Sequence, residues 1–168
     1  SIIAIGASNN DGNGNNSGHV RVFNWNGTSW SQMGQDINGE AADDYSGRVA
    51  LSADGLTLAI GATSNDGNGN GSGHVRVFNW NGSNWIQKGQ DINGEAESDY
   101  FGRVSISDNG LRLAVGGYNN DGNGDNAGHV RVFNWNGGSW SQIGQDIDGE
   151  AAGAVSYTHL TLPTKFVV

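Results

Sequence analysis

The sequence contains no cysteine and one proline among 168 residues, and only 8 lysine and arginine residues against 17 aspartate and glutamate residues. Without cysteine, the chain can form neither a disulfide framework nor a thiolate metal site. The formal charge of −9 would repel a phosphate backbone, so we expect no nucleic-acid partner. No apolar run approaches the ~20 residues that a membrane-spanning helix needs, so we expect no insertion into a membrane.

Glycine is abundant, with 29 residues, and part of this abundance comes from an internal repeat. The string Gly-His-Val-Arg-Val-Phe-Asn-Trp-Asn-Gly begins at Gly18, Gly73 and Gly128, which are spaced 55 residues apart. Residues 10–47 and 65–102 are identical at 30 of 38 positions. We therefore expect each 55-residue unit to be one structural module of a repeat protein.

Four β-strands are predicted in each unit. In the middle unit, residues 47–52 and 56–61 alternate with a period of two around an Ala-Asp-Gly turn, which predicts a hairpin. Residues 74–80 are rich in β-forming side chains, and the Asn-Gly turn after them leads into a fourth strand over residues 85–90. The first two strands carry large side chains on one face and small ones on the other, as expected where sheets stack closely.

A four-stranded antiparallel sheet that repeats at this length is typical of a β-propeller blade, so the predicted fold class is all-β. The main alternative is a β-solenoid, but its coils repeat at far shorter periods and seldom contain regular Asn-Gly hairpins.

Three short motifs resemble the FG-GAP repeat of the integrin α-subunit propeller and of its bacterial and algal surface-protein relatives. Phe101-Gly102 opens a first strand, Gly61-Ala62-Thr63 closes a second, and residues 73–78 form the next. The resemblance covers nearly all of residues 1–153 and implies a ring of seven blades. It departs from the family at Ser46-Gly47, which replaces Phe-Gly, and in the lack of the proline of Gly-Ala-Pro.

The repeat register divides the chain into segments. Residues 1–42 are expected to form three strands of a partial blade and a connector, residues 43–97 the second unit, and residues 98–153 the third. The periodicity then stops, and residues 155–164 resemble a translated sequencing-library adapter, so we interpret residues 154–168 as a non-native tail. About three blades cannot close a ring, and the remaining blades of a longer chain are expected as partners.

Antiparallel connectivity separates the loops between two faces. The hairpin turns lie on one face, with Asp54 and Asp108, whereas the long loops and the connectors between units lie on the other with the remaining 15 of the 17 acidic residues. We expect this acidic long-loop face to bind a cation, a basic protein surface or a polyhydroxy ligand such as a glycan. The candidate ligand-face residues are Asp43, Asp44, Glu97 and Asp99. The alternative is that acidic loops merely keep a glycine-rich repeat soluble.

The long loops alternate oxygen-bearing side chains with glycine, like the first half of an EF-hand loop, and this pattern predicts Ca²⁺ as a cofactor. The candidate ligands are Asp11, Asn13, Asn15, Asp66, Asn68, Asn70, Asp121, Asn123 and Asp125. The alternative is that these residues simply tolerate a positive φ. The calcium loop of FG-GAP proteins does not carry over, because residues 52–55 and 107–110 are too short to supply six to eight oxygens.

Histidine and tryptophan also recur once or twice in each unit. His19, His74 and His129 would lie roughly 13 Å apart in a ring, too far to share one zinc ion, so we expect them to pack at loop-to-strand junctions. Tryptophan pairs such as Trp80 and Trp85 bracket each Asn-Gly turn and are expected to staple the hairpin rather than to stack on sugars. No constellation breaks the repeat symmetry, so no catalytic residue is predicted and the chain is not expected to be an enzyme.

Together these patterns predict an extracellular or cell-surface, non-catalytic binding or adhesion module whose ligand is a protein or a glycan. One alternative is the propeller portion of a secreted glycan-active lyase or hydrolase, with its catalytic residues in blades outside this sequence. A purely structural stalk of repeats is the third.

Overall fold

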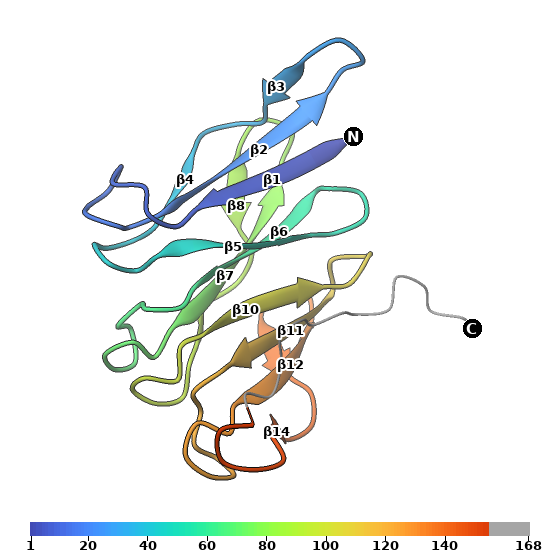
Figure 1. Ribbon diagram of the computed structural model, residues 1–168. Coiled ribbons are helices and arrows are strands. Elements are labelled where there is room, and N and C mark those ends of the chain that lie inside the picture. The colour runs from blue at the N-terminus through green and yellow to red at the C-terminus, as the bar shows by residue number, and fades with distance from the viewer. Residues whose placement is uncertain (155–168) are drawn as a thin grey trace.

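The computed structural model describes residues 1–154, which form three antiparallel β-sheets and no helix (Figure 1). The first sheet contains β1 (Ile2–Ala7), β2 (His19–Trp25), β3 (Trp30–Gln32) and β4 (Ile37–Asn38). The second contains β5 (Ser46–Leu51), β6 (Thr57–Ala62), β7 (His74–Trp80), β8 (Trp85–Gln87) and β9 (Ile92–Asn93). The third contains β10 (Phe101–Ile106), β11 (Arg112–Gly117), β12 (His129–Trp135), β13 (Trp140–Gln142) and β14 (Ile147–Asp148).

The three sheets follow the repeat and confirm the all-β fold class. Each holds antiparallel strands joined in sequence order, and Figure 1 shows the sheets one after another from the blue N-terminal end to the orange end. Within residues 1–154, no helix has the length and apolar character needed to cross a bilayer. The adapter-like segment over residues 155–164 lies outside the described residues, as does the predicted tail except for Ala154.

The prediction of one continuous fourth strand over residues 85–90 was wrong. The strand stops at Gln87, loops out at Gly89, where φ is +82°, and pairs again with the start of β7 through β9. The side-chain amide of Gln87 donates to Asp91 Oδ1 at 2.7 Å and holds this loop closed. Because of this interruption, Asp91 lies beside the first residues of β7 and does not continue the line of β8.

The hydrophobic core lies between the sheets, and β6 shows why. Every residue of β6 is buried. Leu58 and Ile60 pack with Val20 and Val22 of the first sheet, whereas Ala59 belongs to the cluster shared with the third sheet. The predicted division into a large-residue face and a small-residue face is therefore confirmed, and it makes each sheet depend on its neighbours for burial.

Close approach of the sheets explains one glycine of the repeat motif. A Cβ atom at Gly61 would lie 1.8 Å from the backbone oxygen of Gly102, and one at Gly6 would lie 1.9 Å from the backbone oxygen of Gly47. Any side chain at either position would thus collide with the backbone of the next sheet. The glycine that closes a second strand and the glycine that opens the next unit are a contacting pair.

The tryptophan pairs staple the hairpins, as predicted. Trp80 and Trp85 lie directly opposite each other, with ring centroids 5.4 Å apart. In addition, Trp85 Nε1 donates to the backbone oxygen of Met33 at 2.9 Å, and Trp140 Nε1 donates to that of Lys88 at the same distance. The second tryptophan of a hairpin therefore also joins its sheet to the preceding one.

Candidate functional site

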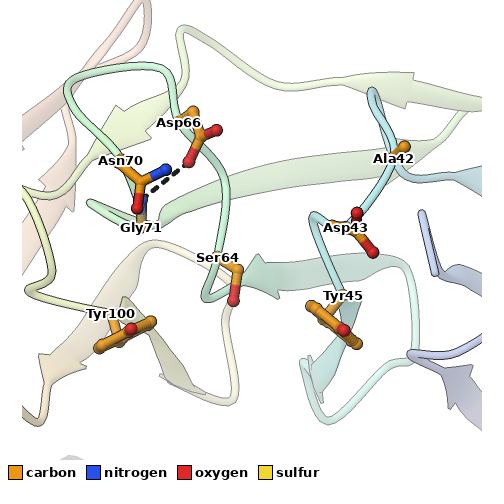
Figure 2. A pocket seen from close by; sticks show the side chains of 8 residues that line it. All are labelled: Ala42, Asp43, Tyr45, Ser64, Asp66, Asn70, Gly71 and Tyr100. Atoms are coloured by element: carbon orange, nitrogen blue, oxygen red, sulfur yellow. Dashed lines mark hydrogen bonds between the residues drawn. The ribbon is translucent and has the colours of Figure 1, made fainter. Parts of the chain in front are cut away.

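The long-loop face contains a pocket of about 370 Å³ between the long loop of the second sheet and the connectors on either side of it (Figure 2). The connectors are residues 39–45, which lead into β5, and residues 94–100, which lead into β10. The lining residues are Ala42, Asp43, Tyr45, Ser64, Asp66, Asn70, Gly71 and Tyr100. Most of these side chains carry a hydroxyl, carboxylate or amide group, so the pocket is a polar hollow bordered by two aromatic rings.

Tyr45 and Tyr100 occupy equivalent positions in consecutive units. Both have a left-handed backbone, with φ of +52° and +48°, which is rare for a bulky residue. Figure 2 shows the two rings on either side of Ser64. Strained backbone of this kind persists only where surrounding contacts enforce it, and it concentrates at binding sites.

Tyr100 is fixed further by a second ring. It stacks on Tyr118, with centroids 5.2 Å apart and an interplanar angle of 7°. The guanidinium of Arg103 lies 5.6 Å from the centroid of Tyr118, whose pKa is raised mainly by burial. The residue equivalent to Tyr118 in the second unit is Thr63, which has no ring that could stack on Tyr45. The two tyrosines that border the pocket therefore differ in their support, although they come from one repeat.

Two of the four predicted ligand-face residues are accessible. Asp43 and Glu97 are both exposed, and Asp43 lines the pocket. Asp43 Oδ1 accepts hydrogen bonds from the side-chain amides of Asn15 at 3.3 Å and Asn16 at 3.0 Å. These bonds tie the connector to the long loop of the first sheet.

The other two, Asp44 and Asp99, are buried, with 3% of each residue exposed. Each accepts a 2.9 Å hydrogen bond from the backbone amide three residues earlier and a second bond, at 3.2 Å, from the side chain of Asn65 or Asn120. Buried carboxylates with such partners hold the connector against the next long loop. Asp44 and Asp99 therefore fix the positions of the loops on this face and do not present a carboxylate to solvent.

The long loops direct their polar side chains toward the protein's own backbone. Asp66 Oδ1 accepts from the amide of Gly71 at 2.8 Å, and Asn68 Nδ2 donates to the carbonyls of residues 94 and 95 at 2.8 and 3.0 Å. The equivalent bonds recur in the first and third loops. Asp66 and Asn70 also line the pocket. Calcium binding by the nine Asp and Asn residues of these loops stays a prediction.

The three histidines begin equivalent strands in different sheets. His19, His74 and His129 are 8%, 2% and 0% exposed, which confirms that they pack at loop-to-strand junctions. Each faces its own carboxylate partners instead of another histidine.

The sequence interpretation missed Tyr45, Tyr100 and Tyr118 as site residues. The signal was present, because Asp-Tyr recurs in both connectors just before the first strand of a unit. Tyrosine carries no charge, so counting charged residues does not reveal this dipeptide. No family model and no curated protein matches the chain, so the inferred function depends on the residues themselves.

Proposed function

We propose that this chain is a non-catalytic binding or adhesion module of the FG-GAP propeller type, acting outside the cell or at its surface. Its ligand is a glycan, held on the acidic long-loop face. The observation that carries the proposal is the polar pocket between Tyr45 and Tyr100, two aromatic residues that the repeat holds in a left-handed backbone. The contact between Gly61 and Gly102, which belong to the two FG-GAP motifs, supports the assignment to that propeller type.

The chemistry of the pocket suits a sugar. The tyrosine rings offer flat apolar faces for the C–H side of a pyranose, and each ends in a hydroxyl group. Asp43 and Asp66 accept hydrogen bonds from sugar hydroxyls, and the amide of Asn70 can both donate and accept. A small number of polar groups around aromatic surface is the usual composition of a small-ligand site.

The negative charge of the face favours a neutral glycan over an anionic one. The chain carries −9 overall, and the pocket itself contains two carboxylates and no basic residue among its lining residues. A sulfated or uronate-rich polymer would be repelled on approach. The proposed ligand is therefore a neutral glycan.

An array of neutral and anionic oligosaccharides, followed by calorimetric titration with the best neutral oligosaccharide, tests the proposal. Tyr45→Ala and Tyr100→Ala should each weaken binding by about tenfold, the effect of removing one aromatic anchor. Trp30→Ala is the control, because Trp30 is 46% exposed and pairs with Trp25 at the end of β2, whereas the connector begins beside His19 at the start of β2. Circular dichroism would verify that each variant is folded.

Three outcomes would contradict the proposal. The first is an array without binding to any neutral glycan. The second is equal loss of affinity in the tyrosine variants and in the Trp30 control. The third is cleavage of the bound oligosaccharide, which would identify an enzyme in place of a binding module.

A further inference from the structure

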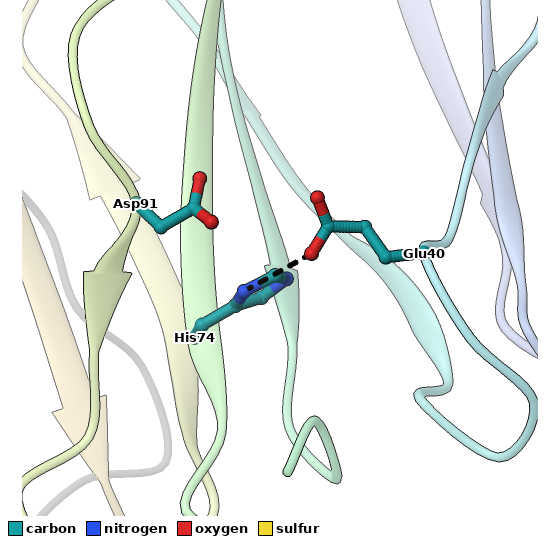
Figure 3. Close-up of side chains that lie close together, drawn as sticks. All are labelled: Glu40, His74 and Asp91. Carbon is teal, nitrogen blue, oxygen red and sulfur yellow. Dashed lines mark ion pairs between the residues drawn. The ribbon is translucent and has the colours of Figure 1, made fainter. Parts of the chain in front are cut away.

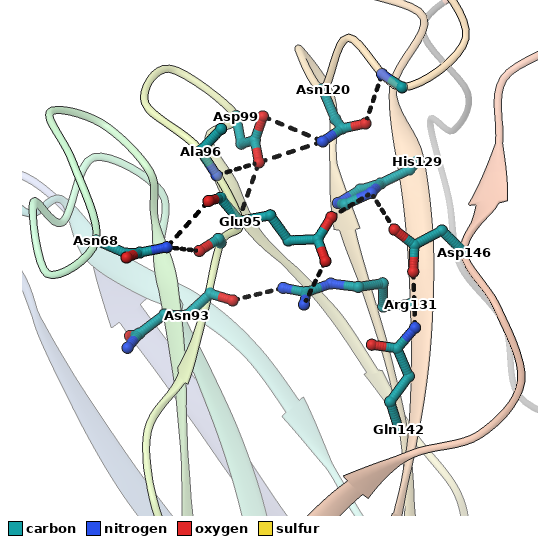
Figure 4. Close-up of polar contacts among 12 residues, drawn as sticks. Asn68, Asn93, Glu95, Ala96, Asp99, Asn120, His129, Arg131, Gln142 and Asp146 are labelled. Atoms are coloured by element: carbon teal, nitrogen blue, oxygen red, sulfur yellow. Dashed lines mark hydrogen bonds and ion pairs between the residues drawn. The ribbon is translucent and has the colours of Figure 1, made fainter.

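A cluster of one histidine and two carboxylates recurs where successive sheets meet. In the second sheet, His74 at the start of β7 lies beside Asp91, and Glu40 reaches it from the connector that follows the first sheet (Figure 3). Glu95, His129 and Asp146 form the same cluster one unit later (Figure 4). In each cluster, one ligand atom from every residue lies within 4.8 Å of the others.

The ring nitrogens of the histidine in the second cluster make no well-aligned hydrogen bond. His129 is fully buried. Its Nδ1 atom faces Asp146 Oδ2 at 3.4 Å and Glu95 Oε2 at 3.9 Å. Burial lowers the pKa of His129, which favours the neutral imidazole whose lone pair can bind a metal ion.

Each carboxylate is held through one oxygen and directs the other toward the imidazole. Gln142 donates to Asp146 Oδ1 at 2.7 Å, while Asp146 Oδ2 faces the ring. Arg131 Nη1 lies 3.4 Å from Glu95 Oε1, while Glu95 Oε2 faces the ring. Outer contacts of this kind orient the ligands of protein metal sites.

The first cluster has the same supports. Gln87 donates to Asp91 Oδ1 at 2.7 Å, and Arg76 Nη1 lies 3.3 Å from Glu40 Oε1. Glu40 Oε2 lies 3.8 Å from His74 Nδ1. Two carboxylates against one guanidinium leave each cluster with a net negative charge.

The separations between ligand atoms fit a zinc-type ion. With bonds of about 2.0–2.2 Å, ligand atoms around a tetrahedral zinc ion lie roughly 3.4 Å apart. The observed separations from His129 Nδ1 are 3.4 and 3.9 Å, so small side-chain rotations would complete the geometry. One imidazole nitrogen with carboxylate oxygens is a ligand set that zinc and its neighbours in the first transition row accept.

We propose that Glu40–His74–Asp91 and Glu95–His129–Asp146 each bind a divalent cation of the zinc type and thereby join successive sheets. The ion links a glutamate of one unit to a histidine and an aspartate of the next. The side chains of Glu40 and Glu95 are 44% and 45% exposed, which leaves an entry path and a fourth position for water.

The first unit provides a control within the same chain. His19 Nδ1 faces Asp36 Oδ2 at 3.6 Å, and Gln32 donates to Asp36 Oδ1 at 2.7 Å. Within residues 1–154, no glutamate joins them. Two protein ligands bind zinc weakly, so the chain should bind two ions and not three.

The experiment uses the 168-residue chain after treatment with a chelator. Calorimetric titration with Zn²⁺ should give two ions per chain, and Co²⁺ should produce the visible absorption of a nitrogen–oxygen site. With both sites filled, a free Zn²⁺ concentration a hundredfold above the dissociation constant should raise the melting temperature by about 10–20 °C. Glu95→Gln and Asp146→Asn should each reduce the count to one ion, whereas Asp36→Asn should leave it at two.

The isosteric variants separate this site from the glycan pocket, because none of the substituted residues lines it. Absence of Zn²⁺ binding by the unmodified chain overturns the proposal, as does a count of two that survives Glu95→Gln and Glu40→Gln. If a variant fails to fold, the Co²⁺ spectrum of the unmodified chain still decides, since a spectrum of oxygen ligands alone excludes the histidines.

Discussion

Replacement of Trp140 by alanine tests whether contacts between successive sheets supply much of the stability of this chain. Trp140 is 4% exposed, and its indole N–H donates to the backbone oxygen of Lys88 in the preceding sheet. Its own backbone is bound by the side chain of Gln90, which donates to the Trp140 carbonyl at 2.7 Å and accepts from the Trp140 amide at 3.2 Å. Trp30, the equivalent residue of the first unit, is 46% exposed.

The difference in burial sets the expected magnitude. A tryptophan buries about 150–250 Å², and ~25 cal/mol per Å² gives roughly 4–6 kcal/mol as an upper bound for Trp140. Measured costs of such truncations are about 3–5 kcal/mol. Trp30 has about half of that burial, so Trp30→Ala should cost roughly half as much. Trp140→Phe keeps most of the ring but removes the donor to Lys88, and should cost about 1–3 kcal/mol.

Urea unfolding followed by far-ultraviolet circular dichroism measures these differences without depending on tryptophan fluorescence. In thermal unfolding followed by the same signal, Trp140→Ala should lower the melting temperature by about 6–20 °C, and Trp30→Ala by roughly half of that. Trp85→Ala should behave like Trp140→Ala, because Trp85 is 3% exposed and donates to Met33 in the same way.

Equal destabilisation by Trp140→Ala and Trp30→Ala would refute the reasoning. It would mean that both residues act only within their own hairpin, through the ring contacts that all three units share. A small change in the free energy of unfolding of Trp140→Ala, with an unchanged m-value in urea, would likewise show that the docking of one sheet on the next adds little to stability.

Two further predictions concern the backbone and the short-turn face. Gly61→Ala should destabilise the chain by about 3 kcal/mol in urea unfolding, because the added methyl group would overlap the backbone oxygen of Gly102. Gly138→Ala should stay within about 0.5 kcal/mol of the parent, because a methyl group there would meet only Asn136 Oδ1, at an ordinary contact distance of 3.9 Å. The hydroxyl of Ser52, at 2.6 Å, and a backbone amide lower the pKa of Asp54 in the folded chain. Its contribution to stability is therefore present above the unfolded pKa of about 3.9 and is lost as the pH falls through the lower folded value. The free energy of unfolding, measured by urea unfolding at a series of acidic pH values, should depend less on pH in Asp54→Asn than in the parent. Identical curves for the two proteins would contradict the role of Asp54.

Local chemistry made most of the strands predictable. The alternation in residues 47–52 and 56–61 and the Asn-Gly turn at residues 81–82 lead to β5, β6 and β7 within one residue of the predicted bounds. The break in the fourth strand was not predictable by the same means. It depends on a positive φ at Gly89 and on a bond between Gln87 and Asp91, and neither leaves a periodic pattern.

The candidate site was only partly predictable for a similar reason. Counting charges found the acidic long-loop face, including Asp43 and Asp66, but it could not separate exposed carboxylates from buried ones such as Asp44 and Asp99. Whether a carboxylate faces solvent depends on which amides the neighbouring loop brings to it.

The sequence by itself determined the repeat, because the same string recurs at a spacing of 55 residues. It also determined the all-β class and the hairpin staples, because these depend on residues a few positions apart. Only the tertiary structure decided which residues from different units meet. Glu40 reaches His74 from 34 positions away, and Tyr45 shares a pocket with Tyr100 across a whole unit. Such contacts are created when one sheet packs on the next, and a repeated string gives every unit the same residues without stating which neighbour each one will touch.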